Sequence, residues 1–137
     1  MYQLTDNGVI RLSDNASIPN AEGNRDWQEY QVWLADGNSP LPVPPPTEEQ
    51  LRSIWKAERA AAVEAIVVTT AAGNIFDGDE TSQARMARAI LGLQVSGADA
   101  TVTWVLSDNS VIQATGAELQ EALALAGAEQ ARLWVAA

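Results

Sequence analysis

Acidic side chains gather in the stretch GNIFDGDETSQARMARAI, residues 73–90, and they are the first candidates for chemistry. Asp77, Asp79 and Glu80 fall within four positions, as the ligands of a calcium loop or a pair of catalytic carboxylates can. An EF-hand loop also needs an acid or amide at position five, a glycine at position six and a closing glutamate. Here position five is Thr81, and neither the glycine nor the glutamate follows. The match to a calcium loop is therefore weak.

The same stretch has the composition of a turn followed by the start of a helix. Gly78 permits the turn, and Asp79 or Thr81 can accept hydrogen bonds from the first free N–H groups of a helix. Acids near this end favour the helix dipole, while Arg85 and Arg88 stand one turn further on, at the spacing of i,i+3 and i,i+4 contacts. We therefore expect a turn and a helix cap here rather than a metal or catalytic site.

The chain lacks the residue types on which most catalytic sites depend. It contains no cysteine and no histidine, which excludes disulfides and thiolate metal sites and removes the commonest acid–base group near neutral pH. Ser13, Ser82 and Ser110 have no histidine to activate them, and no GxSxG, SxxK or glycine-rich phosphate motif is present. The sequence predicts a protein that is not an enzyme and needs no cofactor and no metal.

Charge and hydropathy restrict the partners further. Eight basic against eighteen acidic residues give a formal net charge of −10, whereas nucleic acids and anionic membranes attract basic surfaces. No apolar run approaches the roughly 18 residues of a membrane span, and the N-terminus does not resemble a signal peptide. We expect a protein partner, or a second copy of this chain, and neither nucleic acid nor membrane.

Residues 1–37 are predicted to form a small hairpin–helix module. Asn7-Gly8 lies between two β-prone runs and predicts strands near 2–5 and 9–12, followed by a loop in SDNASIPN. A short helix follows, with Asn24 or Asp26 as N-cap and Gly37 just past its end.

Three large aromatic residues share one face of this short helix. They are Trp27, Tyr30 and Trp33, spaced i, i+3 and i+6. One interpretation is that they pack on the hairpin. The other, which we adopt as the candidate site, is a partner-binding patch, because three such rings are many for so small an element.

Residues 38–46 are predicted to form a proline-rich linker, and residues 47–137 an α+β domain. Five prolines between residues 40 and 46 favour an extended spacer. After it, periodicity and turn residues predict the order α-β-β-α-β-β-α, with strands paired as hairpins. Two capping boxes are predicted to open helices, the first formed by Thr47 and Gln50 and the second by Thr115 and Glu118.

Apolar residues in each helix of this domain predict its buried face. The first helix, ending near Ala65, has the stripe Leu51, Ile54, Trp55, Val63 and Ile66, and the later helices turn inward Met86, Ile90, Leu93, Leu119, Leu123 and Leu133. Trp104 in a strand and Trp134 near the C-terminus are also expected in the core.

The C-terminal stretches IVVTTAAGNIFDGDETSQARMARAI and VTWVLSDNSVIQATGAELQEAL resemble a domain of unknown function that is common in proteins encoded beside tail-fibre genes of tailed bacteriophages and prophages. The pattern is an apolar strand, G-x-x-F-D-x-D, a helix with S-x-x-R, a tryptophan strand and an acidic-leucine helix, filled here by Gly73, Phe76, Asp77, Asp79, Ser82, Arg85, Trp104 and Leu119. The front half is similar to a segment that often precedes this domain, with Pro19, Asn24, Trp27, Tyr30, Trp33, Gly37 and Pro40 in place.

This resemblance implies a non-enzymatic bacteriophage tail protein that binds the tail fibre or baseplate, as a virion component, a fibre assembly chaperone, or both. It would act in the host cytoplasm during assembly or in the virion tail. The alternative is a hydrolase of host-surface glycans that uses carboxylates among Asp77, Asp79 and Glu80, which requires two carboxyl groups facing each other across roughly 5–9 Å. An acidic decoy is a further alternative, suggested by charge alone, although the acids are scattered over both halves.

Overall fold

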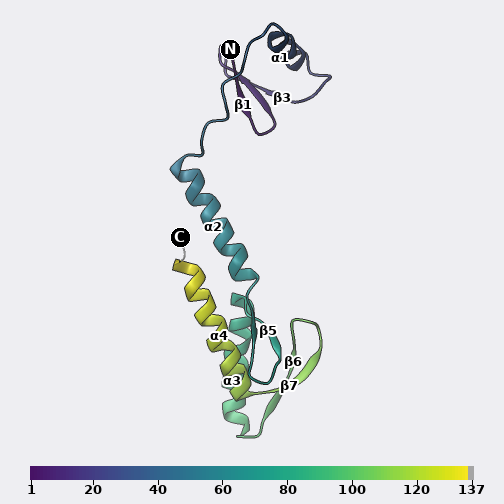
Figure 1. Cartoon of the computed structure of the whole chain (residues 1–137). Helices are drawn as coiled ribbons and strands as arrows, with labels where there is room; N and C mark the ends of the chain where they lie inside the picture. The colour runs from purple at the N-terminus through teal and green to yellow at the C-terminus, as the bar shows by residue number, and fades with distance from the viewer. Residues whose placement is uncertain (136–137) are drawn as a thin grey trace. The chain divides into compact units, whose positions relative to one another are not determined.

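The computed structural model describes residues 1–135 and divides the chain into two compact units, Met1–Thr47 and the part from Glu48 onward. Four helices and three antiparallel sheets occur in the described residues, which confirms the predicted α+β class. Figure 1 shows the helices and strands with the labels used below.

The first unit is a three-stranded antiparallel sheet covered by one helix. Strands β1 (Tyr2–Thr5), β2 (Gly8–Arg11) and β3 (Ala16–Pro19) lie in the order β1-β2-β3, and helix α1 spans Arg25–Ala35. The hairpin and helix were predicted, but β3 lies where the sequence predicts a loop. Its residues are mostly polar or small, and only Ile18 is buried, paired with Val9 of β2. A strand with one inward apolar residue carries too little alternation to be recognised.

The chain after α1 returns to the sheet of the first unit. The Leu41 N–H donates to the Tyr2 carbonyl at 2.9 Å, and the Leu4 N–H donates to the Leu41 carbonyl at 2.9 Å, which forms a parallel bridge beside β1. The sequence predicts a free spacer over 38–46, and the structure differs at Leu41 because β1 is an edge strand with unpaired backbone groups. The proline-rich residues after Leu41 follow as an exposed segment that leads to Thr47.

The second unit has the predicted order of elements. After α2 (Glu48–Glu64) come β4 (Val67–Thr69) and β5 (Ile75–Asp77), then α3 (Glu80–Ser96), β6 (Thr101–Val105), β7 (Val111–Thr115) and α4 (Gly116–Val135). The strands form two separate antiparallel hairpins, β4-β5 and β6-β7. Because neither hairpin has a third strand, both depend on the helices to cover their apolar faces.

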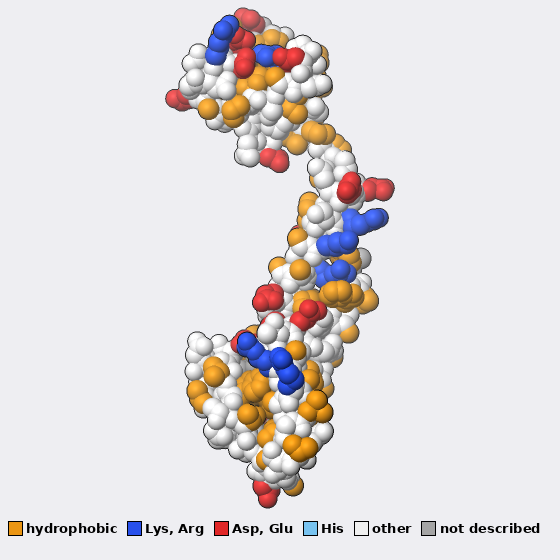
Figure 2. Space-filling view, turned by 180° about the vertical axis from the view of Figure 1, so that it is seen from behind, with side chains coloured by type: hydrophobic (Ala, Val, Ile, Leu, Met, Phe, Trp, Pro, Cys, Tyr) orange, Lys and Arg blue, Asp and Glu red, His pale blue; other side chains and the backbone are white. Residues whose placement is uncertain are grey.

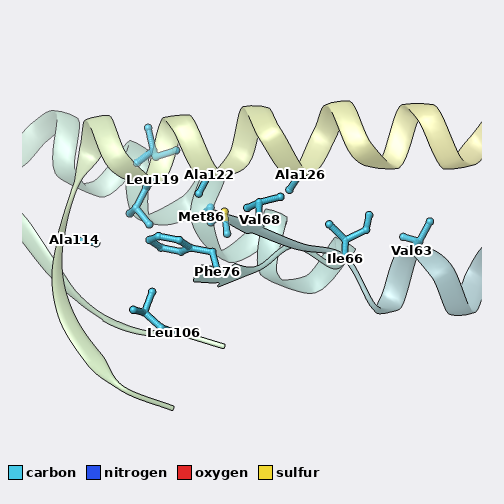
Figure 3. Packing of buried hydrophobic residues seen from close by; sticks show 11 residues of the cluster. Val63, Ile66, Val68, Phe76, Met86, Leu106, Ala114, Leu119, Ala122 and Ala126 are labelled. Atoms are coloured by element: carbon cyan, nitrogen blue, oxygen red, sulfur yellow. The ribbon is translucent and has the colours of Figure 1, made fainter. Parts of the chain in front are cut away.

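The core of the second unit lies where α3 and α4 meet the two hairpins. Phe76, Met86 and Leu119 are fully buried, and each comes from a different element, β5, α3 and α4. Figure 3 shows the Phe76 ring among the side chains of Met86, Leu119 and Leu106, with Ala122 and Ala126 on the adjoining face of α4. Small residues on this face of α4 let it approach the hairpin closely.

Gly78, between β5 and α3, is required by this close approach. Its N–H donates to the Ile66 carbonyl at 2.7 Å. A Cβ at this position would lie 2.5 Å from Cγ2 of Ile66 and 3.0 Å from Cβ of Ala126. The sequence predicts Gly78 as a turn residue, but its backbone angle φ is not positive, so lack of space rather than turn geometry demands glycine.

Candidate functional site

The three aromatic residues of α1 pack against the sheet of their own unit. The ring of Tyr30 lies 5.0 Å from that of Tyr2, and Trp33 lies 5.1 Å from Tyr2, both in edge-on geometry. Trp27 is tilted against Tyr30 at 5.1 Å. These are favourable separations for aromatic pairs, so the cluster supplies much of the core of a small unit.

The three predicted contact residues differ in how far they are buried. Tyr30 is only 4% exposed and offers almost no surface to a partner, whereas Trp27 and Trp33 are half-buried and present part of each ring to solvent. The structure therefore brings all three rings together and leaves two of them accessible. Partner binding through Trp27 and Trp33 stays a prediction.

A charge network joins α1 to strand β2 of the sheet. The Arg11 guanidinium donates to Asp14 and to Asp26, each at 2.8 Å, and lies 3.8 Å from Glu29. The hydrogen bonds from Arg11 hold the pKa of Asp14 below its ordinary value. Because Arg11 belongs to β2 and two of its partners belong to α1, this contact fixes the orientation of the aromatic face.

The acidic turn before α3 is a helix cap, as predicted. Asp79 is the N-cap residue, and its carboxylate accepts from the backbone N–H groups of Thr81 and Ser82 and from the Ser82 hydroxyl. Those bonds, the one from the Ser82 hydroxyl first, lower the pKa of Asp79. No cluster of three or more potential metal-ligating side chains occurs among the described residues.

The other predicted members of this stretch differ from expectation. Among the described residues, Arg85 forms no ion pair or hydrogen bond, and Arg88 donates to the Ala84 carbonyl instead of pairing with an acid. No acid stands three or four positions from Arg85 or Arg88, so the predicted i,i+3 and i,i+4 ion pairs have no partner on α3. Asp77 is exposed, and Asp77, Ser82, Arg85 and Trp104 line one pocket of about 390 Å³.

The apolar stripe of α2 is only partly used by the core. Val63 and Ile66 are buried as predicted, but Leu51 and Ile54 are 53% and 49% exposed. Figure 1 shows α2 beside α4, and the core elements of the unit reach only the C-terminal part of α2. The prediction that the whole stripe is buried is wrong, because periodicity identifies an apolar face without identifying what covers it.

The middle of α2 meets the end of α4 through an arginine between two indoles. The Arg59 guanidinium lies 4.3 Å from the ring centroid of Trp55 and 4.0 Å from that of Trp134, and it donates to the Trp134 carbonyl at 3.5 Å. Trp134, predicted as core, is 47% exposed and stacks on this cation instead. The spacing of Trp55 and Arg59 could have suggested their contact, but the distant Trp134 could not be placed from the sequence.

We call the exposed part of this region the α2 surface, formed by Leu51, Ile54, Trp55, Arg59 and Trp134. Arg52 and Lys56 flank it, and neither forms an ion pair with the described residues. Figure 2 shows a row of basic side chains over α2 with hydrophobic side chains beside them. The surface combines uncovered apolar area with unpaired positive charge in an otherwise acidic chain.

A family model described as Domain of unknown function (DUF4376) matches residues 47–137. The chain belongs to the DUF4376 family. The match begins one residue before α2, so the DUF4376 domain contains the α2 surface and the pocket at Asp77 and Arg85, and the aromatic cluster of the first unit lies outside it. No curated protein and no solved structure matches the chain. No described helix is long and apolar enough to cross a membrane.

Proposed function

We propose that this chain is a non-enzymatic bacteriophage tail protein that binds the tail fibre or baseplate, as a virion component or as a fibre assembly chaperone. The observation that carries the proposal is the α2 surface. Leu51 and Ile54 are large apolar side chains about half exposed and one helical turn apart, on the same helix whose Arg59 stacks on the exposed indole of Trp134. Clustered exposed apolar residues of this kind are typical of protein–protein contacts.

The charges around this surface indicate the chemistry of the partner. Arg52, Lys56 and Arg59 are three of the eight basic residues of the chain and fall within eight positions. A partner with apolar side chains flanked by carboxylates would complement this face and be steered toward it. The stacked Arg59 is held in place before binding, so less side-chain entropy is lost when a carboxylate pairs with it.

The first unit provides a second contact in this proposal. Trp27 and Trp33 present half-buried rings on a rigid face, and exposed tryptophan edges are common anchors at interfaces. Two modest contacts joined by a short segment bind more tightly together than either alone, because the second binding event is intramolecular. The proline-rich residues after Leu41 provide such a connection.

The test is co-purification with a bacteriophage tail-fibre protein, the partner that the proposal names. We expect the double variant Leu51→Glu/Ile54→Glu to weaken binding at least about tenfold, because charges would be buried without partners. Glutamate is a good helix former, so α2 is retained. Val95→Glu is the matched control, since Val95 is 88% exposed on α3, away from the α2 surface. Equal binding by wild type and the double variant would refute the role of this surface.

Two further measurements complete the test. Mass spectrometry of purified virions decides between a virion component and a transient chaperone. Trp27→Ala and Trp33→Ala, compared with Val32→Ala on the exposed side of α1, test the second contact. We expect only the tryptophan variants to reduce co-purification, with the backbone fold checked by circular dichroism. If neither tryptophan variant changes binding or assembly state, the aromatic face is purely internal core.

A further inference from the structure

One pocket lies between β5, the first turns of α3 and the β6–β7 hairpin. Several polar side chains that line it form no hydrogen bond with other described residues of the chain. Its lining combines Asp77, Ser82, Arg85, Thr103, Trp104, Val105, Leu106 and Asn109 around about 390 Å³. Ser82 and Thr103 are engaged, since Ser82 donates to Asp79 and Thr103 accepts from Gln113 at 3.0 Å. Within residues 1–135, the side chains of Asp77, Arg85 and Asn109 form no hydrogen bond.

Opposite charges line this pocket without neutralising each other. Asp77 and Arg85 belong to β5 and α3, on either side of the Asp79 cap, and no ion pair between them occurs in the described part of the chain. An ion pair between exposed side chains contributes little, so two opposite charges can line one pocket without joining. Both charged groups of this pocket are therefore available to a ligand that contacts both.

The pocket also has an aromatic wall that is fixed by the core. Trp104 is half-buried, and its ring lies 6.3 Å from the fully buried Phe76. One part of the indole therefore packs inward while another lines the pocket. Because the face of an aromatic ring is electron-rich, it attracts the weakly positive C–H groups of a saturated ring.

We propose that this pocket binds a saccharide that carries one carboxylate, of the uronic acid type. Arg85 pairs with the sugar carboxylate through its planar guanidinium, and Asp77 accepts hydrogen bonds from ring hydroxyls. Asn109 can both donate and accept, and its backbone is in the left-handed conformation at φ 65°, at the turn of the β6–β7 hairpin. The Trp104 ring packs on the C–H face of the sugar. This site lies apart from the α2 surface, and the inference goes beyond the proposed function.

The proposed ligand explains the combination of groups better than its competitors do. A neutral sugar leaves Arg85 unpaired, and a phosphate-rich ligand would bring two or more negative charges near Asp77. A carboxylate together with hydroxyls satisfies both charged residues at once. An acidic peptide could also pair with Arg85 but supplies few hydroxyl donors for Asp77, so it serves as the competing probe.

The experiment is a titration of the isotope-labelled full chain, followed by amide and indole NMR signals. The probes are glucuronic acid, glucose and a triglutamate peptide. We expect glucuronic acid to shift the Trp104 indole signal and the amides of residues 77–85 and 103–109, with a Kd on the order of 1 mM, as is ordinary for one sugar ring. Glucose should bind at least about tenfold more weakly, because it lacks the charge-assisted contact.

Matched variants separate the site from general charge effects. Arg85→Gln should weaken glucuronic acid at least about tenfold, whereas Arg88→Gln, one turn along α3 and outside the pocket, should leave it unchanged. Both side chains are exposed, so both variants keep the fold, as unchanged signals elsewhere will show. The proposal is overturned if glucuronic acid produces no local shifts, if Arg88→Gln has the same effect as Arg85→Gln, or if triglutamate binds the pocket and the sugar does not.

Discussion

The side-chain amide of Asn74 donates a 2.7 Å hydrogen bond to the Glu118 carboxylate, which ties the β4–β5 turn to the first turn of α4. The same carboxylate accepts from the hydroxyl of Thr70 at 2.9 Å, and Thr70 is only 3% exposed. Its neighbour Glu121 accepts from the Ala71 N–H at 2.7 Å. The β4–β5 hairpin is therefore held to α4 by two adjacent carboxylates.

Replacing Glu118 should destabilise the second unit. Glu118→Ala removes the acceptor of the Asn74 amide and leaves the buried Thr70 hydroxyl only the longer contact to the Asn74 carbonyl at 3.4 Å, at a cost of about 1–3 kcal/mol in the free energy of unfolding. Urea unfolding monitored by circular dichroism measures it. Glu129→Ala is the control, since the Glu129–Arg132 pair on the same helix is exposed and should contribute little to stability. Equal effects of the two variants would contradict the role of Glu118.

Two glycine substitutions should change stability in opposite directions. Gly78→Ala should destabilise the second unit by about 1–3 kcal/mol, because its Cβ would lie 2.5 Å from Ile66 and 3.0 Å from Ala126. Gly92→Ala should stabilise by about 0.5–1 kcal/mol, because Gly92 is inside α3 and nothing lies within 4 Å of an added Cβ. The melting temperature should fall for Gly78→Ala and rise for Gly92→Ala, relative to wild type. A tolerated Gly78→Ala would show that the packing between α4 and Ile66 is loose.

The Asp79 cap should make stability depend on pH in the acidic range. Asp79→Ala should cost about 0.5–2 kcal/mol near neutral pH, the range for a lost N-cap. Because the folded pKa of Asp79 lies below its unfolded value of about 3.9, the charge contributes fully above that value and its contribution is lost as the pH falls through the folded pKa.

Asp79→Asn isolates this titration, because asparagine caps a helix but does not ionise. The difference in unfolding free energy between wild type and Asp79→Asn should be constant above about pH 5 and shrink below about pH 4. Urea unfolding at a series of pH values measures the difference. A difference that grows on acidification would show that the Asp79 carboxylate is not stabilised by its cap.

The second unit should fold without the first. Each unit has its own buried cluster, and the residues between Leu41 and α2 are exposed. Limited proteolysis should therefore cut near Val43 and leave a stable fragment that begins near Thr47. We expect this fragment, expressed alone, to retain the helical circular dichroism and cooperative melting of the second unit. An unfolded fragment would mean that the two units stabilise each other.

Local patterns predict the elements of this fold well where the pattern and the burial agree. Asn24 caps α1 and Asp79 caps α3 as predicted, because a cap is decided by a few neighbouring residues. The predicted box at Thr115 forms only in part. The Thr115 hydroxyl accepts from the Glu118 N–H at 3.2 Å, but the Glu118 carboxylate turns to Thr70 and Asn74, which are distant in sequence.

The candidate sites could be predicted only in part, for the same reason. The sequence identified the rings of α1 but could not show that Tyr30 is covered while Trp27 and Trp33 are half-exposed. It assigned Arg85 to a local ion pair, whereas the fold directs Arg85 to a pocket shared with Trp104. Tertiary contacts of this kind depend on how the elements pack, and no local spacing encodes them.

The Leu41 bridge determines where a mechanical load would enter the first unit. Tension applied through the proline segment reaches the two hydrogen bonds of Leu41 before it reaches the β1–β2 ladder or the aromatic core. These two hydrogen bonds at the edge of the sheet resist force less than the β1–β2 ladder and the aromatic core, which carry the load only after the bonds of Leu41. They would open first under a pull, lengthen the connection by the residues between Gly37 and Leu41, and leave the fold of the unit intact.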